Sequence, residues 1–405
     1  MRELLAKFGL DKHHVIERFG VLFIAALMFV IGTGISGFIQ FEKIRHAALG
    51  TTAMYSSSFV TSMSGVHGTV EGVYTNNDKT RGFVLLHYDD IKSISIDAQN
   101  YNVYIMGVDN NRIYKEDLKS QMAGCIYLFG NTGYMGIYLM CAEGFESQIT
   151  MLTVRANNQM ANTVMPLTDE SYATIDQFNT YVNLGAEGTG HLNFLESNGV
   201  LDVTEMYEEL VVRPAEYQVE AMLNQQLQDI VTYEAQFEEY TNRLRNQGII
   251  VPERPYAING DIISYDNNTG LYTLNTDVVA AGAWNLDWQH HSISDGYIDA
   301  EIGDMLPVDY FAMKAAEVDE IPFDTSTLVW YRSDGTIWYR VEDGTATTRN
   351  INEDIDYLTN LWEEFYRDKV AYQTAQEELI NLAYSIHDAD STFTVNNNLN
   401  AVVMW

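Results

Sequence analysis

The longest uninterrupted hydrophobic stretch of the chain runs from Phe19 to Ile39 and contains no charged residue. At a rise of about 1.5 Å per residue, a helix of this length crosses a hydrocarbon layer of roughly 30 Å. A helix also satisfies its own backbone hydrogen bonds within lipid. The pattern therefore predicts a single-pass membrane protein with a transmembrane helix, a signal anchor, over 19–39.

The residues on either side of this stretch predict its orientation. Residues 1–18 carry more Lys and Arg than the first residues after the span, which favours a cytoplasmic N-terminal tail. The rest of the chain would then be an extracytoplasmic, extracellular domain held at the cell membrane by residues 40–65, a juxtamembrane stalk. A cleaved signal peptide is the alternative, but its apolar region is normally shorter and ends at a small-residue cleavage site.

Small residues gather in the second half of the predicted span. Gly32 and Ser36 are four residues apart, and Gly37 stands four residues after Thr33. This spacing allows two membrane helices to approach closely, so Gly32, Ser36 and Gly37 are candidates for packing between spans. Glycines that are merely tolerated in a membrane helix are the alternative.

Short segments rich in Val, Ile and Tyr follow one another from residue 66 to residue 160 and are separated by Asn, Asp and Gly clusters. Close, regular spacing of such segments is typical of antiparallel sheets that pack face to face. We predict a β-sandwich-like domain over 66–160. Residues 161–213 show no clear periodicity and are predicted to be a connector.

Two later stretches have the periodicity of long helices. Over 214–247, apolar residues recur every seven positions, and over 351–387 a second such row follows; the members are Leu223, Ile230, Phe237 and Leu244, then Ile351, Leu358, Phe365, Tyr372, Leu379 and Ile386. A sustained seven-residue period predicts coiled-coil packing along these interface residues. Pairing within one chain is the preferred arrangement, and pairing between copies is the alternative.

The region between the two helices contains hairpin patterns. Residues 257–345 include two strand pairs with turn sequences between them, which predicts a second, β-rich domain inserted between the helices. Residues 392–405 resemble a terminal strand. The predicted fold class is thus a single-pass membrane protein with an α+β ectodomain: a β-sandwich-like domain, two long helices and a β-rich insert.

Composition restricts the partners of this chain. The formal net charge is −33 and 46% of the residues are hydrophobic, which is enough apolar material for folded cores. A strongly acidic surface repels nucleic acid and anionic lipid headgroups, so we expect no nucleic-acid partner. Cys125 and Cys141 flank a predicted hairpin, and two alternatives stay open for them: a disulfide or two buried thiols.

No catalytic or cofactor motif is present in the sequence. His290 and His291 are weak candidates for a metal site, because adjacent histidines in a strand point to opposite faces and no third ligand is suitably spaced. The sequence lacks the serine-hydrolase, zinc-protease and phosphate-loop patterns. We therefore predict no metal, no cofactor and no enzymatic activity.

Two functions are consistent with these predictions. The first is a structural subunit of a cell-envelope assembly, such as a secretion or transfer apparatus or a surface appendage, which forms homo-oligomers or binds other envelope proteins. The second is a cell-surface adhesin or ligand-binding receptor ectodomain without its own signalling domain. Exposed tryptophans among Trp284, Trp288, Trp330 and Trp338 would favour the second.

Overall fold

The computed structural model describes residues 49–156, 176–197, 201–254, 263–268, 271–274, 286–302, 325, 328–340 and 349–397. The chain divides into two compact units. Unit 1 consists of Met1–Gly199 together with Thr394–Trp405, and unit 2 of Val200–Phe393.

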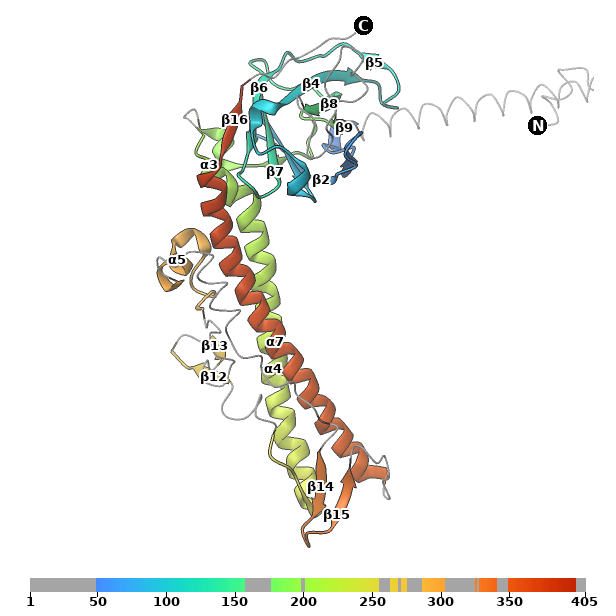
Figure 1. The fold of residues 1–405 in the computed structure, drawn as a ribbon, viewed down its shortest axis with the longest axis vertical. Helices are drawn as coiled ribbons and strands as arrows, with labels where there is room; N and C mark the ends of the chain where they lie inside the picture. The colour runs from blue at the N-terminus through green and yellow to red at the C-terminus, as the bar shows by residue number, and fades with distance from the viewer. Residues whose placement is uncertain are drawn as a thin grey trace, which may run out of the picture. The chain divides into compact units, whose positions relative to one another are not determined.

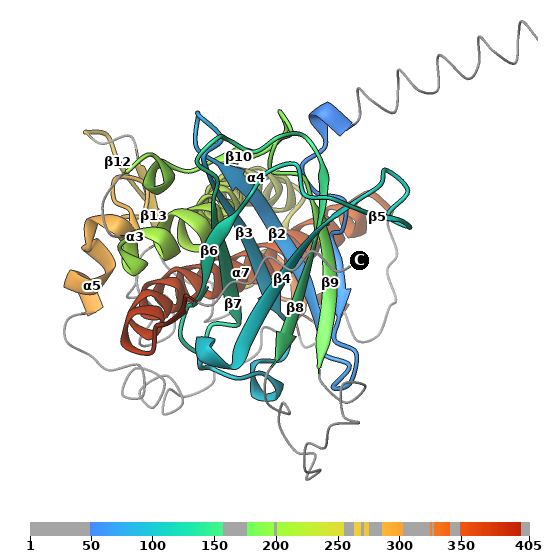
Figure 2. The same cartoon turned by 90° about the horizontal axis from the view of Figure 1, so that it is seen from above.

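Unit 1 is built from two β-sheets (Figures 1 and 2). The first sheet has the strand order β1-β2-β3-β7-β6-β16, with β10 beside β2, and the second has the order β5-β4-β8-β9. The strands of the first sheet are β1 (Ser58–Val60), β2 (His67–Thr75), β3 (Arg81–Tyr88), β6 (Ala123–Leu128), β7 (Tyr134–Met140), β10 (Gly190–His191) and β16 (Thr394–Asn396). Those of the second are β4 (Tyr101–Val108), β5 (Lys115–Glu116), β8 (Ile149–Ala156) and β9 (Gln177–Val182). Short 3-10 turns lie at η1 (Ile91–Ser93), η2 (Ala98–Asn100) and η4 (Asn193–Glu196).

The two sheets of unit 1 share one hydrophobic core. All strand pairs are antiparallel except β10 with β2. Side chains of both sheets point inward, and Leu86 and Ile137 from the first sheet join Val103 and Leu152 from the second with no exposed surface. Two antiparallel sheets with alternating buried positions make a sandwich-like arrangement.

This sandwich recruits strands from outside 66–160. β1 lies in the range predicted as the stalk 40–65, and β9 and β10 lie in the range predicted as the connector 161–213. β16 lies within the predicted terminal strand 392–405 and pairs with β6. β1 and β10 were missed because such short strands carry too few alternating positions to stand out. β9 is six residues long and alternates between exposed and buried positions, a pattern that the prediction of a connector overlooked.

Cys125 and Cys141 are both buried and both free. Cys125 in β6 is paired with Tyr138 of β7, and opposed residues of an antiparallel pair point to the same face. Cys141 stands three positions beyond Tyr138, so alternation places it on the opposite face, where it belongs to the sandwich core. The two thiols therefore lie on opposite faces of the sheet, which leaves the buried-thiol alternative.

Unit 2 begins with one continuous helical stretch. α3 (Val203–Tyr207) passes through a single π-helical turn, Glu208–Val212, into α4 (Arg213–Asn246). Pro214 was expected at the start of the helix, because it has no N–H to donate. The wider turn just before Pro214 instead lets the helix continue through it, and the helical stretch extends eleven residues, from Val203 to Arg213, into the predicted connector.

The second long helix of unit 2, α7 (Arg349–Ser391), runs beside α4 (Figure 1). The apolar stripes of the two helices face each other within one chain: the rings of Phe237 and Phe365 have centroids 5.6 Å apart. The predicted stripe residues with fully or nearly fully buried side chains are Leu223, Ile230, Phe237, Leu244, Leu358, Phe365, Tyr372 and Leu379. Ile386 is half-buried, and the side chain of Ile351 lies outside the described residues.

The predicted coiled coil is nevertheless wrong. The buried face of α7 is wider than a two-position seam, because Asp354, Thr359 and Ile380 are buried beside the stripe. Segments between the helices cover the extra width: Trp330 stacks on Trp362 with ring centroids 6.0 Å apart. The helices are therefore sealed by the intervening chain as well as by each other.

The prediction of a β-rich domain inserted between the helices is also wrong. The described part of 257–345 holds two small, separate antiparallel sheets and short helical segments. β14 (Val329–Arg332) and β15 (Ile337–Arg340) form one sheet with β11 (Ile249–Ile250), which precedes this range; β12 (Ile263–Asp266) and β13 (Leu271–Leu274) form the other, and η7 (Ile293–Asp295) and α5 (Tyr297–Ile302) are the helical segments. A two- or three-stranded sheet this small cannot enclose a core of its own, and β11, η7 and α5 lie against the long helices.

The membrane prediction receives a correction as well. Within the described residues, the structure has no helix with the length and apolar character that crossing a bilayer requires. The predicted tail 1–18 and the span 19–39, with Gly32, Ser36 and Gly37, lie outside those residues. The described structure therefore does not support the predicted single-pass topology or the predicted cell-membrane location.

A close backbone approach in unit 1 provides a test of the fold. A Cβ added at Gly185 would lie 2.3 Å from the carbonyl carbon of Glu146, so the backbone would have to shift. We expect Gly185→Ala to lower the free energy of unfolding by about 1–3 kcal/mol. Urea unfolding measures this change, with Gly50→Ala as the matched control, because a Cβ at helical Gly50 meets no atom within 4 Å. Equal stability of the two variants would contradict the predicted clash.

Candidate functional site

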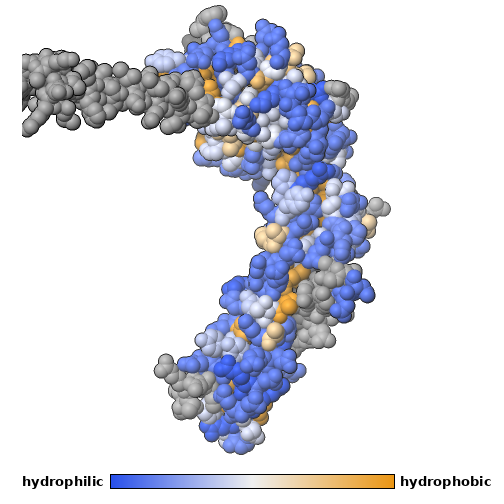
Figure 3. All heavy atoms as spheres, turned by 180° about the vertical axis from the view of Figure 1, so that it is seen from behind, coloured by the Kyte–Doolittle hydropathy of each residue, from blue (hydrophilic) through white to orange (hydrophobic). Residues whose placement is uncertain are grey.

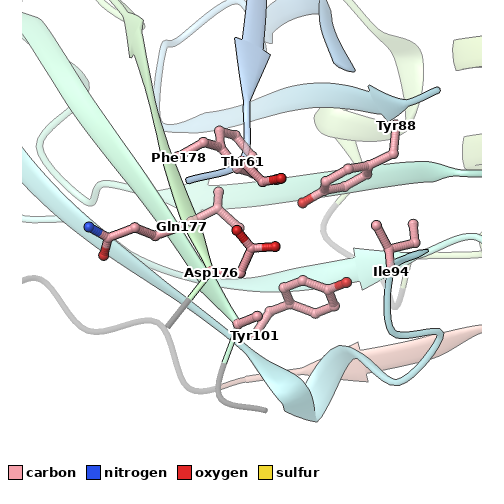
Figure 4. A pocket seen from close by; sticks show the side chains of 9 residues that line it. Thr61, Tyr88, Ile94, Tyr101, Asp176, Gln177 and Phe178 are labelled. Atoms are coloured by element: carbon pink, nitrogen blue, oxygen red, sulfur yellow. The ribbon is translucent and has the colours of Figure 1, made fainter. Parts of the chain in front are cut away.

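A small hollow in unit 1 is the best candidate for a binding site among the described residues. It lies where strand ends meet: Tyr88 ends β3, Tyr101 begins β4, and Asp176 immediately precedes β9, while Thr61 follows β1 (Figure 4). The volume of the hollow, counted as the space open to the centre of a water molecule, is about 10 Å³. This is space for about one water molecule or one group of that size.

Asp176 supplies the charge of the hollow. Its side chain is in a residue only 5% exposed, and it accepts hydrogen bonds from the backbone N–H groups of Met63 at 2.9 Å and Ser64 at 3.4 Å. The Ser64 hydroxyl donates a third bond to the same carboxylate. These donors are all neutral, and within the described part of the chain Asp176 forms no ion pair.

Two buried tyrosines face Asp176 across the hollow. Burial raises the pKa of the Tyr88 hydroxyl well above its usual value, and the charges of Tyr101 and Asp176 raise it further. Burial likewise raises the pKa of Tyr101, against a lowering by its bond to Ser95, while Asp176 raises it again. Both phenols therefore stay protonated at neutral pH.

The hydroxyl of Tyr88 is poorly satisfied. Its one hydrogen-bond partner in the described structure is the sulfur of Met135, at 3.9 Å, and a thioether is a weak acceptor. Tyr101 differs, because its hydroxyl accepts from the backbone N–H of Ser95 at 2.9 Å and donates to the Ser95 carbonyl at 3.1 Å. Figure 4 shows the Tyr88 hydroxyl and the Asp176 carboxylate pointing toward the same space.

The structure places the two weak metal candidates, His290 and His291, in different surroundings. Nδ1 of exposed His290 lies 3.0 Å from the carboxylate of Asp287, whereas the ring of His291 stacks on Tyr297 with centroids 4.2 Å apart. The two rings thus have different neighbours. The described residues contain no group of three or more His, Cys, Asp or Glu side chains placed to hold a metal ion.

Unit 2 contains a second cluster of titratable groups, around Glu216 of α4. This carboxylate is nearly buried and accepts a 2.7 Å hydrogen bond from the backbone N–H of Ile293, which attaches the 286–302 segment to the helix. Trp288 of the same segment donates through its indole N–H to the Tyr372 hydroxyl at 3.1 Å. The segment is therefore tied to both α4 and α7.

The sequence contained a signal for Glu216 that the pattern analysis missed. Glu216 stands seven residues before Leu223, so it occupies a position of the apolar row. A carboxylate at such a position calls for a buried partner. Asp176 had no comparable signal, because the residues around its hollow come from separate strands and loops.

Comparison of the chain with protein-family models, with curated proteins and with solved structures found no match.

The environment of Glu216 predicts a pH dependence. The pKa of its carboxyl is raised, mainly by burial and further by the charges of Asp295 and Glu208. The hydrogen bond from the Ile293 N–H and the charge of Arg213 lower this pKa in part. Because the folded pKa lies above the unfolded one, the stability that this group contributes is full below the unfolded pKa and is lost as pH rises through the folded pKa.

We therefore expect Glu216→Gln to stabilise unit 2 more at pH 7 than at pH 4, where more of the carboxyl is protonated. Thermal unfolding at both pH values measures the difference. Glu238→Gln on the exposed face of α4 serves as the control and should show a smaller pH dependence. A larger benefit of Glu216→Gln at pH 4 than at pH 7 would contradict the expected sign.

Proposed function

We propose that this protein is a structural subunit that assembles with copies of itself, and that the α4–α7 pair serves as a stiff arm in the assembly. The observation that carries the proposal is an exposed apolar sheet face on β11, β14 and β15, mounted on these helices. Monomeric proteins seldom leave aligned apolar side chains in solvent without a contact for them to make.

Three apolar side chains form this face. Ile250 of β11 is paired with Tyr331 of β14, which is in turn paired with Ile337 of β15, so all three point the same way. Their exposed fractions are 49%, 40% and 48%. We call this row the sheet face.

The other side of the same sheet is firmly attached. Trp330 has no exposed surface and stacks on Trp362 of α7, and Ile249 is also buried. A sheet with one anchored side and one apolar exposed side presents a rigid contact surface, which reduces the ordering cost of association.

The sheet face is the part of the surface on which charge opposes a second copy least. With a net charge of −33, two copies repel each other over most of their surfaces. On the side shown in Figure 3, hydrophilic side chains cover most of the described surface. The row of Ile250, Tyr331 and Ile337 carries no charge, so two such rows can meet without bringing like charges into contact.

The adhesin or receptor alternative is less well supported. Trp288 is 4% exposed and Trp330 is fully buried, so neither offers an aromatic surface to a ligand. Trp338 is half-buried beneath the guanidinium of Arg332, which lies 4.0 Å from its ring centroid, and Trp284 lies outside the described residues. Trp288 and Trp330 thus contact the helix pair instead of forming an exposed patch.

Self-assembly is tested by light scattering of the full chain at low and high salt. We expect oligomers whose share rises with salt, since salt screens repulsion between the acidic copies. Ile337→Glu should reduce association at least tenfold, because it places a charge within the sheet face.

Met222→Glu supplies the matched control, since Met222 is similarly exposed (47%) on α4 but lies away from the sheet face. A monomer at every salt concentration would refute the proposal. So would equal loss of association in both variants.

A further inference from the structure

We propose that the hollow around Asp176 binds a single primary ammonium group, either that of a small free amine or the end of a lysine side chain. This inference concerns unit 1 and does not depend on the self-assembly of the chain. It stands on three features of the hollow: an unbalanced buried charge, aromatic walls and its size.

The charge of Asp176 has no counter-charge in the described structure. A carboxylate taken out of water is normally paired with a cation, because neutral hydrogen bonds replace only part of its hydration. Asp176 has three neutral donors from Met63 and Ser64 and forms no ion pair with a described residue. A carboxylate has about four acceptor positions, so one remains for a further donor.

The chain next to the hollow cannot supply this cation. Residues 157–175, which connect Ala156 to Asp176, contain no Lys, Arg or His. A positive charge must therefore come from elsewhere. The net charge of −33 concentrates cations near the surface and favours their entry.

The walls of the hollow suit an organic cation. The rings of Tyr88, Tyr101 and Phe178 line it together with Asp176. Tyr88 and Phe178 meet edge to face with centroids 5.9 Å apart, and Phe178 is stacked on Phe59, so the rings are held in place. Aromatic faces attract ammonium groups through their quadrupole, and aromatic rings beside a carboxylate are a recurrent arrangement for binding them.

The Tyr88 hydroxyl completes the set of acceptors. Its oxygen keeps free lone pairs, and its only described partner is the distant sulfur of Met135. An ammonium group carries three N–H donors, which matches the Asp176 carboxylate and the Tyr88 oxygen better than a water molecule with two. The burial of Tyr88 keeps its proton in place, so the oxygen accepts without ionising.

The size of the hollow limits what it admits. Its volume of about 10 Å³ admits one ammonium head. A quaternary ammonium group is larger and is excluded. The hollow is partly open and not fully enclosed, and exposed Gln177 is one of its lining residues. An opening of this kind leaves room for the alkyl stem of an amine.

The inference is tested by amide NMR of the full chain. We expect methylammonium and Nα-acetyl-lysine amide to shift the amide signals of Met63 and Ser64 saturably, while sodium chloride at equal ionic strength and tetramethylammonium do not. Shifts with methylammonium alone would assign the site to free amines, and shifts with both would show that it also accepts a lysine end. Either result supports an ammonium site.

Two variants locate the binding. Asp176→Asn should weaken methylammonium binding at least tenfold, because it removes the charge-assisted bond. Tyr88→Phe should weaken it severalfold while preserving the ring and the fold, so the test stands even where Asp176→Asn fails to fold.

Asp109→Asn is the control, since Asp109 similarly accepts from backbone N–H groups, those of Ile113 and Tyr114, but follows the opposite end of β4 from Tyr101 and does not line the hollow. Its affinity for methylammonium should equal that of the unchanged protein. Three results would overturn the inference: no saturable shift with either amine, equal shifts with sodium chloride, or unchanged affinity in both Asp176→Asn and Tyr88→Phe.

Discussion

The burial of two apolar stripes against each other is the constraint on which unit 2 depends. A single helix in water is marginally stable, and α4 and α7 become ordered because Phe237 and Phe365 and their neighbours leave solvent together. Two donors within this contact meet at one oxygen: Gln376 donates to the Tyr372 hydroxyl at 3.2 Å, and Trp288 donates to the same oxygen. The intervening segments then pack on two helices whose mutual register is set by this contact.

Unit 1 shows the same principle with sheets in place of helices. Its core is apolar, and buried polar side chains tie its loops together at the strand ends. Asn183, for example, accepts from the backbone N–H groups of Gln148 and Gly185 and donates to the Leu49 carbonyl at 2.7 Å. Asp176 holds a neighbouring turn in the same way, but its charge exceeds what neutral donors balance. That difference separates a structural polar group from a candidate binding group.

The acidic surface connects both proposals physically. A large negative charge opposes contact between copies and attracts cations. Association therefore requires an uncharged apolar contact, such as the sheet face, that compensates for the repulsion. A buried carboxylate beside aromatic rings is where an attracted organic cation would gain contacts that solvent does not offer.

Sequence periodicity by itself determined the elements whose pattern repeats over many residues. The seven-residue rows in 214–247 and 351–387 predicted both long helices, because one buried stripe on a helix requires that spacing whatever covers it. What covers the stripes was decided by tertiary structure, and Trp330 and Trp288 contribute where a coiled coil was expected. For Cys125 and Cys141 the sequence left a disulfide or two buried thiols open, and the register of β6 with β7, which depends on the turn between them, separates the thiols. The hollow at Asp176 lay beyond the sequence altogether, because strand pairing brings together residues that no local pattern links.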